Sequence, residues 1–368
     1  MSTATTTNPT QTATPAPSLE QLEAFTMKFV GDPGAVAHAA TVVLGDKLGL
    51  YTTLAATGPA TPAELADATG YDARYLREWL LAQAASGYAN YDSKTGTFWL
   101  DAAQAACLAD DSAPTFLAGG MAVVSSMHRD EDAVRDAFVT GEGVGWHEHH
   151  HDLFSGTERF FRPGYAANLV SAWIPAIDGL DAALRRGISV ADIGCGFGSS
   201  TILMAEAYPD SSFVGYDYHA ESIAAARSRA ADAGVSDRVT FEVASAAAYP
   251  GSDFDLVCIF DALHDMGDPT QAAAHVRASL AEGGVLLLVE PNAAEQVEDN
   301  FNIVGRVFYS ASTFVCTPAS RAQGGADAAC LGAQAGETQL RSVLTDAGFS
   351  SVLRATETPF NMVIAARP

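Results

Sequence analysis

Two carboxylates bracket a glycine-rich turn in the middle of this chain. Asp192 precedes Gly194, Cys195 and Gly196, and Asp217 ends the next apolar stretch. Glycine adopts positive φ angles and lets a ligand approach the backbone closely, and the N-terminus of a helix that follows such a turn attracts anionic groups. A carboxylate at the end of the second stretch can accept hydrogen bonds from both hydroxyls of a ribose. The spacing therefore predicts a nucleoside-binding turn.

A dinucleotide is the first alternative for this nucleoside. The dinucleotide fingerprint requires a glycine at position 199, where this chain has Ser199, and it requires no carboxylate at the position of Asp192. A glycine turn that serves only packing would need neither Asp192 nor Asp217. The paired acids therefore favour a different nucleoside ligand.

The segment with an acid before the glycines and a second acid one strand later resembles the class I S-adenosylmethionine-dependent methyltransferases. The resemblance implies that Gly194, Cys195 and Gly196 line the amino-acid part of S-adenosylmethionine, that Asp217 holds its ribose, and that Asp192 orients the loop. Ligands in open α/β sheets bind beyond the carboxyl ends of the strands. The expected cofactor site is completed by residues at those ends or just before the first strand: Phe161, Tyr165, Tyr218, Ser245, Ala246, Phe260 and Asp261.

A second segment, residues 260–268, holds a histidine that could act as a base. Leu263, His264 and Asp265 resemble the Leu-His-Asp-Trp segment of small-molecule O-methyltransferases, which carry an N-terminal winged-helix dimerisation domain; Met266 replaces the tryptophan. The resemblance implies that His264 is the general base and that Glu290, after the fifth strand, orients it. A hydroxyl is a weak nucleophile at neutral pH, so a histidine base held by a carboxylate fits this chemistry. A core or capping histidine, and a solvated acid, are the structural alternatives.

Acceptor-binding residues are expected at Trp146, His147, His149 and Tyr309. His147, His149 and His151 alternate, so on a strand they would face one way and could hold a metal. Methyl transfer requires no metal, and we therefore expect His147 and His149 to line the mouth of the acceptor site and no metal to be bound. Residues 145–154 and 157–165 resemble a family of actinobacterial methyltransferases. This resemblance does not indicate which molecule accepts the methyl group.

The elements that must position these residues alternate between strands and helices. Such alternation predicts a mostly parallel sheet covered on both faces, and the closely spaced last two strands predict an antiparallel C-terminal hairpin. The expected fold class is therefore α/β: a Rossmann-like class I methyltransferase sheet with an N-terminal, mainly α winged-helix domain. The expected strands are 188–193, 212–216, 239–243, 254–260, 284–289, 351–356 and 360–366.

The winged helix is expected within residues 54–100. Thr61 and Glu64 form the pattern of a capping box, Asp72 precedes a second helix, and residues 88–100 form a hairpin. Two further helices, 19–30 and 33–48, are expected before it, separated at a proline. The second helix of the motif carries Arg74 and Arg77 against acidic neighbours, which is too little positive charge for several phosphate contacts. We therefore expect this domain to mediate homodimerisation and to cover the substrate.

Composition sets the remaining expectations. The 368 residues carry a formal net charge of −24, which argues against nucleic acid as a partner. The five scattered cysteines are typical of reduced cytosolic thiols, and no apolar run is long enough to span a bilayer, so we expect a soluble, cytoplasmic protein. The expected domains are a disordered tail (1–17), the winged-helix dimerisation domain (18–112), a connecting and substrate-covering segment (113–159) and the S-adenosylmethionine-binding domain (160–368).

Overall fold

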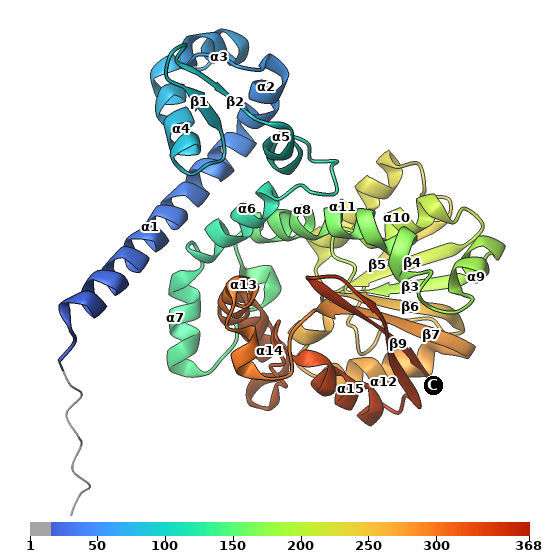
Figure 1. Cartoon of the computed structure of the whole chain (residues 1–368). Coiled ribbons are helices and arrows are strands. Elements are labelled where there is room, and N and C mark those ends of the chain that lie inside the picture. Colours follow the sequence, from blue (N-terminus) through green and yellow to red (C-terminus); the bar gives the residue numbers. More distant parts are fainter. Residues whose placement is uncertain (1–15) are drawn as a thin grey trace, which may run out of the picture.

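The computed structural model describes residues 16–368 (Figure 1). An N-terminal domain of helices and a small hairpin precedes a larger α/β domain, and α6 and α8 lie between them. The strands are β1 (Asn90–Asp92), β2 (Thr97–Trp99), β3 (Ser189–Ile193), β4 (Ser212–Asp217), β5 (Val239–Val243), β6 (Phe254–Phe260), β7 (Leu280–Pro291), β8 (Ser351–Glu357) and β9 (Asn361–Arg367).

The α-helices are α1 (Leu19–Lys47), α2 (Leu50–Thr57), α3 (Pro62–Thr69), α4 (Ala73–Ala85), α5 (Ala102–Leu108), α6 (Ala118–Met127), α7 (Glu131–Thr140), α8 (His151–Asn168), α9 (Leu180–Arg186), α10 (Ser199–Ala207), α11 (Ala220–Asp232), α12 (Pro269–Ser279), α13 (Ile303–Ala311), α14 (Thr317–Gly324) and α15 (Gly336–Asp346). Short 3₁₀ or π segments are η1 (Trp146–Glu148), η2 (Leu169–Trp173), η3 (Leu263–Asp265), η4 (Val297–Asn300), η5 (Ser312–Cys316) and η6 (Gly325–Asp327).

The winged-helix prediction is confirmed in its local detail. The Thr61 hydroxyl accepts a hydrogen bond from the Glu64 backbone and the Glu64 carboxylate accepts one from Thr61, which is the capping box of α3. Asp72 caps α4 by accepting from the N–H groups of Arg74 and Tyr75. Strands β1 and β2 pair antiparallel to form the wing. These caps satisfy backbone donors that a helix start leaves without partners.

The predicted break between residues 30 and 33 is wrong, because α1 runs unbroken through Pro33. A proline inside a helix loses one backbone hydrogen bond and crowds the preceding turn, at a cost of about 3 kcal/mol. Burial of Val42 and Val43 in the second half of α1 stabilises the helix, and Asp32 forms an exposed ion pair with Arg306 of α13 at 2.8 Å, which contributes at most about 1 kcal/mol. The tail prediction for residues 1–17 lies outside the described residues, apart from 16 and 17.

The seven-stranded sheet confirms the predicted fold class. Its strand order is β5-β4-β3-β6-β7-β9-β8. The five strands from β3 to β7 in chain order run parallel, whereas β9 pairs antiparallel with both β7 and β8. Successive side chains of a strand point to opposite faces of the sheet, and here both faces carry apolar side chains. Helices therefore cover both faces. Val190 packs with η2, α9 and α10 on one face, and its neighbour Ala191 packs with α12 and α15 on the other.

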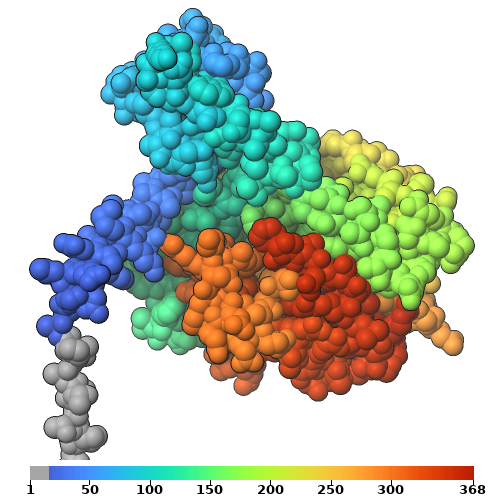
Figure 2. All heavy atoms as spheres, viewed as in Figure 1, coloured from blue at the N-terminus to red at the C-terminus, as the bar shows by residue number. Residues whose placement is uncertain are grey.

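Helix α8 connects the two domains. It packs against α6 on one side and α10 on the other, and it runs across residue 160, where the expected boundary of the catalytic domain falls. In the space-filling view, α1 extends from the body as a separate arm (Figure 2). Among the described residues, no helix combines the length and apolar character that crossing a bilayer requires.

Gly143 tests the packing of the segment that precedes η1. A Cβ there would lie 1.9 Å from the backbone nitrogen of Ala322 in α14, so Gly143→Ala must displace backbone. We expect a loss of about 1–3 kcal/mol in unfolding free energy, measured by chemical denaturation. The matched control is Gly164→Ala in α8, where a Cβ meets open space and alanine should stabilise by about 0.5–1 kcal/mol. Equal effects of the two substitutions would contradict this packing.

Candidate active site

A cavity of about 450 Å³ opens at the carboxyl ends of the parallel strands, beside the point where the strand order reverses between β3 and β6. This is where open α/β sheets bind ligands. Asp192, His264 and Glu290 lie outside its lining, buried beside residues that belong to it. The sequence-predicted residues that line it are Trp146, Phe161, Tyr165, Gly194, Cys195, Gly196, Asp217, Tyr218, Ser245, Ala246, Phe260 and Asp261.

The glycine turn after β3 faces Asp217. Gly194 and Gly196 have φ angles of 72° and 52°, and a Cβ on Gly196 would meet no atom within 4 Å, so the backbone is open to a ligand there. The Gly196 N–H donates to Asp217 Oδ2 at 2.9 Å, and the His219 N–H donates to Oδ1 at 2.8 Å. Burial raises the pKa of Asp217, and these two hydrogen bonds oppose the rise. The turn and the carboxylate thus form one preassembled unit.

Asp192 lies beneath this turn. Its Oδ2 accepts hydrogen bonds of 2.6 Å from the hydroxyls of Ser200 and Thr201, in the first turn of α10. Burial raises the pKa of Asp192 to about 6, although both hydroxyls favour the charged form. The side chain therefore fixes the start of α10 relative to β3. Asp192 orients the turn and does not itself line the cavity.

Asp261 directly follows β6 and has a strained conformation, with a φ angle of 48°. It accepts hydrogen bonds from the Tyr165 hydroxyl at 2.9 Å and from the Asn361 side-chain amide at 3.0 Å. Burial, and then the charge of Glu290, raise the pKa of Asp261 to about 7. The pairing with Asn361 joins residues 100 positions apart, and no local sequence signal indicates that it holds Asp261.

His264 and Glu290 form a buried pair. Glu290 Oε2 lies 2.5 Å from His264 Nδ1, and Glu290 Oε1 accepts from the Leu263 N–H at 2.9 Å. Because a carboxylate only accepts, the proton of a neutral His264 sits on Nδ1 and the lone pair on Nε2. Burial lowers the pKa of His264, but Glu290 and Asp265 outweigh it and raise that pKa well above its usual range. The ring is thereby oriented and strengthened as a proton acceptor.

The structure places the expected acceptor residues in different surroundings. Trp146 lines the cavity and donates its backbone N–H to the Tyr218 hydroxyl at 3.1 Å. His147 is exposed, His149 is buried against Asp130, and Tyr309 lies on α13, and none of the three is in the lining of the cavity among the described residues. The residues around His147 form η1 and the start of α8, so the strand-like alternation of histidines does not occur.

Glu158 of α8 lines the cavity and was not a candidate in the sequence. It accepts a hydrogen bond of 2.7 Å from the Ser199 hydroxyl and pairs with Arg229 at 2.7 Å and with Arg162 at 2.9 Å. Burial alone would raise its pKa, but the arginines lower it, so the group stays charged. This network fastens the covering helix α8 to the first turn of α10. The spacing of Glu158 and Arg162 along one helix face was the one available signal.

Two family models match the chain, one in each of its domains. A family model described as "Methyltransferase domain" matches residues 184–348, and one described as "Rv2258c-like winged HTH domain" matches residues 36–110. The chain therefore combines a methyltransferase domain with an N-terminal winged helix-turn-helix domain. The matched methyltransferase region contains the glycine turn, Asp217, His264 and Glu290, and the resemblance seen in the sequence is confirmed.

Curated relatives match this chain over part of their length. It is 37% identical over 131 residues to 27-O-demethylrifamycin SV methyltransferase of Amycolatopsis mediterranei (strain S699), covering 33% of this chain and 48% of that protein. It is 35% identical over 115 residues to trans-aconitate 2-methyltransferase of Variovorax paradoxus (strain S110), covering 31% and 42%. The chain thus spans less than half the length of these curated relatives.

Solved structures match this chain over nearly its whole length. Mitomycin 7-O-methyltransferase superposes with a TM-score of 0.66 at 18% identity, covering 94% of this chain and 99% of that one. Human N-acetylserotonin methyltransferase, in complex with S-adenosylmethionine, gives a TM-score of 0.66 at 17% identity, covering 96% and 99%. At this identity the likeness shows the fold alone, including the order of the two domains.

Asp217 is the residue whose loss should affect nucleoside binding most directly. Asp217→Asn replaces a charged acceptor by an amide, and hydrogen bonds to charged groups contribute about 1.5–3 kcal/mol, so affinity for S-adenosylmethionine should fall about 10- to 100-fold. Equilibrium dialysis with radiolabelled S-adenosylmethionine measures this. Asp232→Asn on the exposed face of α11 is the control and should bind as the unaltered chain does. Unchanged affinity in Asp217→Asn would remove this residue from the binding site.

Proposed function

We propose that this chain transfers a methyl group from S-adenosylmethionine to a hydroxyl group of a small molecule, with His264 as the general base. The observation that carries the proposal is the His264–Glu290 pair, which orients a basic ring nitrogen at the end of β6, next to the cavity. S-adenosylmethionine, when bound, supplies a methyl group on a sulfonium whose leaving group is neutral. The protein's main task is then to hold the acceptor in line and to take its proton.

Residues of the cavity divide this work between them. Asp217 is suited to the ribose hydroxyls, and Gly194 to Gly196 offer a backbone that a ligand can approach closely. Phe161 and Tyr165, on the covering helix α8, are assigned to the methionine end. Trp146 and Met266 line the same cavity and provide apolar surface for the acceptor.

His264 accepts the hydroxyl proton at Nε2 in this scheme. Glu290 holds Nδ1 and stabilises the imidazolium that forms, so that the charge created in the step is met by a charge already in place. His264 as a residue is only 5% exposed, which keeps bulk water away from the proton that moves. An acceptor that bears a nitrogen or carbon nucleophile is the alternative for the same fold, and it would depend less on this base.

Replacing His264 tests the assignment. His264→Gln should retain S-adenosylmethionine binding, while methyl transfer to a hydroxyl acceptor falls by about two to four orders of magnitude. The assay is mass spectrometry of methyl-labelled products from a panel of phenols, alcohols, carboxylic acids and amines incubated with labelled S-adenosylmethionine. His128→Ala, an exposed histidine at the end of α6, is the control. Turnover of a hydroxyl acceptor at an unchanged rate in His264→Gln would exclude this residue as the base.

Helix α1 supports the further proposal that the N-terminal domain forms a homodimer. Its projecting half exposes Leu22, Phe25 and Phe29 by 49%, 67% and 59%, at spacings that place them on one face. An exposed apolar stripe of this kind marks an interaction surface. A second copy of the chain supplies a matching stripe, since a two-fold interface uses the same patch on both partners.

A DNA-binding regulator is the alternative that a winged-helix domain raises. Arg74 and Arg77 of α4 both pair with Glu78 of the same helix, whose carboxylate neutralises one of the two positive charges. With a formal net charge of −24, the chain offers little attraction to phosphates. These observations favour a role in self-association for the domain. The cytoplasmic location of the protein stays a prediction.

Sedimentation measurements test the dimer. The unaltered chain should sediment as a dimer, and Phe25→Glu combined with Phe29→Glu should shift it to the monomer, because burying carboxylates in an apolar interface is costly. Glu20→Gln, on the opposite side of α1, should leave the dimer intact. A monomeric unaltered chain would contradict the proposal, and so would a dimer that the double substitution leaves unchanged.

A further inference from the structure

Three potential metal ligands meet behind the acceptor end of the cavity. His264 and Asp265 come from η3, Cys316 comes from η5, and their ligand atoms all lie within 4.8 Å of one another. His264 and Cys316 are buried, whereas Asp265 is partly exposed and lines the cavity. Cys316 ends a π-helical turn, an irregularity that is frequent at functional sites. Residues more than 50 positions apart in the sequence thus converge on one point.

Two buried polar atoms near this point lack hydrogen-bond partners. Asp265 Oδ1 lies 3.2 Å from His264 Nε2 without the alignment of a hydrogen bond, and His149 Nε2 has no partner within the described residues. Burial raises the pKa of Asp265, while His264 and, more weakly, His149 oppose the rise, so the three groups share one electrostatic environment. Leaving such atoms without a partner costs about 1–3 kcal/mol each. A cation bound to Asp265 would remove this cost at that carboxylate.

The outer partners of the histidines have the arrangement found around bound metals. Glu290 holds His264 at Nδ1, at 2.5 Å, and Asp130 holds His149 at Nδ1, at 2.9 Å. Metal-ligating histidines usually pair one ring nitrogen with a carboxylate, which orients the other nitrogen toward the metal. In both residues it is Nε2 that remains for a ligand.

We propose that His264 Nε2, Asp265 and Cys316 form a binding site for Zn²⁺, with His149 Nε2 as the nearby candidate for the fourth ligand. Thiolate, imidazole and carboxylate are the three donor types that zinc binds in proteins, and thiolate selects against Mg²⁺ and Ca²⁺. On binding, the Cys316 thiol loses its proton to solvent and the thiolate sulfur forms the metal bond. Asp265 also lines the cavity, so the ion would lie beside it.

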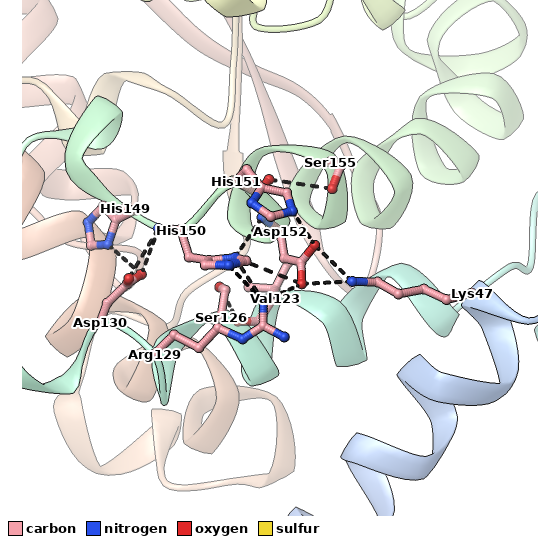
Figure 3. Close-up of polar contacts among 10 residues, drawn as sticks. All are labelled: Lys47, Val123, Ser126, Arg129, Asp130, His149, His150, His151, Asp152 and Ser155. Carbon is pink, nitrogen blue, oxygen red and sulfur yellow. Dashed lines mark hydrogen bonds and ion pairs between the residues drawn. The ribbon is translucent and has the colours of Figure 1, made fainter.

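A second histidine cluster in the chain is unsuited to a metal. His150, His151 and Asp152 lie close together at the start of α8, but Lys47 and Arg129 both pair with Asp152, at 2.9 and 2.8 Å (Figure 3). Arg129 also contacts the His150 ring. Two fixed cations already neutralise the carboxylate, so a third would be repelled. Within residues 16–368, no Lys or Arg takes part in the ion pairs of His264 and Asp265.

Zinc at this site would block the proposed reaction. His264 Nε2 cannot accept a proton while its lone pair is bound to a metal, so the loaded enzyme should transfer methyl groups much more slowly than the metal-free enzyme. This consequence rests on the proposed function, whereas the binding site itself does not.

Cobalt substitution tests the site without any knowledge of the acceptor. The purified full chain is stripped with a chelator and titrated with Co²⁺, whose bond to thiolate gives a charge-transfer absorption in the near ultraviolet. We expect this band to saturate at one equivalent and to disappear when Zn²⁺ is added. Cys316→Ser should abolish the band, and Glu290→Gln should weaken metal binding about 10- to 100-fold.

Cys107→Ser, in the winged-helix domain, is the matched control and should keep the full band. Radiolabelled S-adenosylmethionine binding checks that each variant is folded. A missing band in the unaltered chain, or an unchanged band in Cys316→Ser, would overturn the zinc site.

Activity measurements separate the two proposals. With an acceptor found in the panel, stoichiometric Zn²⁺ should stop methyl transfer by the unaltered chain, and a chelator should restore it. Zinc that binds with the thiolate band but leaves turnover unchanged would contradict coordination through His264 Nε2. A metal-free chain that methylates no acceptor would instead refute the proposed function, and the cobalt spectrum would still decide the metal site.

Discussion

Burying carboxylates at the ends of adjacent parallel strands is the constraint on which this site depends. Asp192 on β3, Asp217 on β4, Asp261 after β6 and Glu290 on β7 all come to one edge of the sheet. Burial raises the pKa of Asp192 to about 6 and that of Asp261 to about 7, so their charge is marginal at neutral pH. Hydrogen-bond donors directed at the carboxylate oxygens stabilise the charged form of each group. The protonation of the site therefore depends on the fold that holds these donors in place.

Those donors come from parts of the chain that must be in place at the same time. Asp192 is met by α10, Asp217 by the glycine turn, Asp261 by α8 and β9, and Glu290 by η3. The antiparallel hairpin β8–β9 therefore has a role beyond closing the edge of the sheet, because Asn361 at the start of β9 reaches Asp261. Glu158 performs the equivalent task on the other side, where it binds α8 to α10. The cavity is thus preorganised before any ligand enters.

The sequence predicted what local chemistry determines. The caps at Thr61 and Asp72, the parallel strands and the C-terminal hairpin follow from residue types and spacing, and the structure has all of them. The resemblance to O-methyltransferases placed Glu290 beside His264, and the two are in contact. Pro33 was misjudged because the contacts that keep α1 continuous come from residues far along the chain.

The parts of the site that escaped prediction depend on long-range packing. His147, His149 and His151 read as an alternating set, but a 3₁₀ turn and the start of α8 separate them, so each meets different neighbours. Asn361, Glu158, Asp130 and Cys316 acquire their positions only when distant elements assemble, and no periodicity in a single segment reports such contacts.

The central claim is that the glycine turn and Asp217 form a site for a sulfonium nucleoside. Isothermal titration of the purified chain with S-adenosylhomocysteine, and separately with NAD, tests it most directly. The account predicts saturable binding of one S-adenosylhomocysteine per chain and no heat of binding for NAD. Binding of NAD without any affinity for S-adenosylhomocysteine would contradict it.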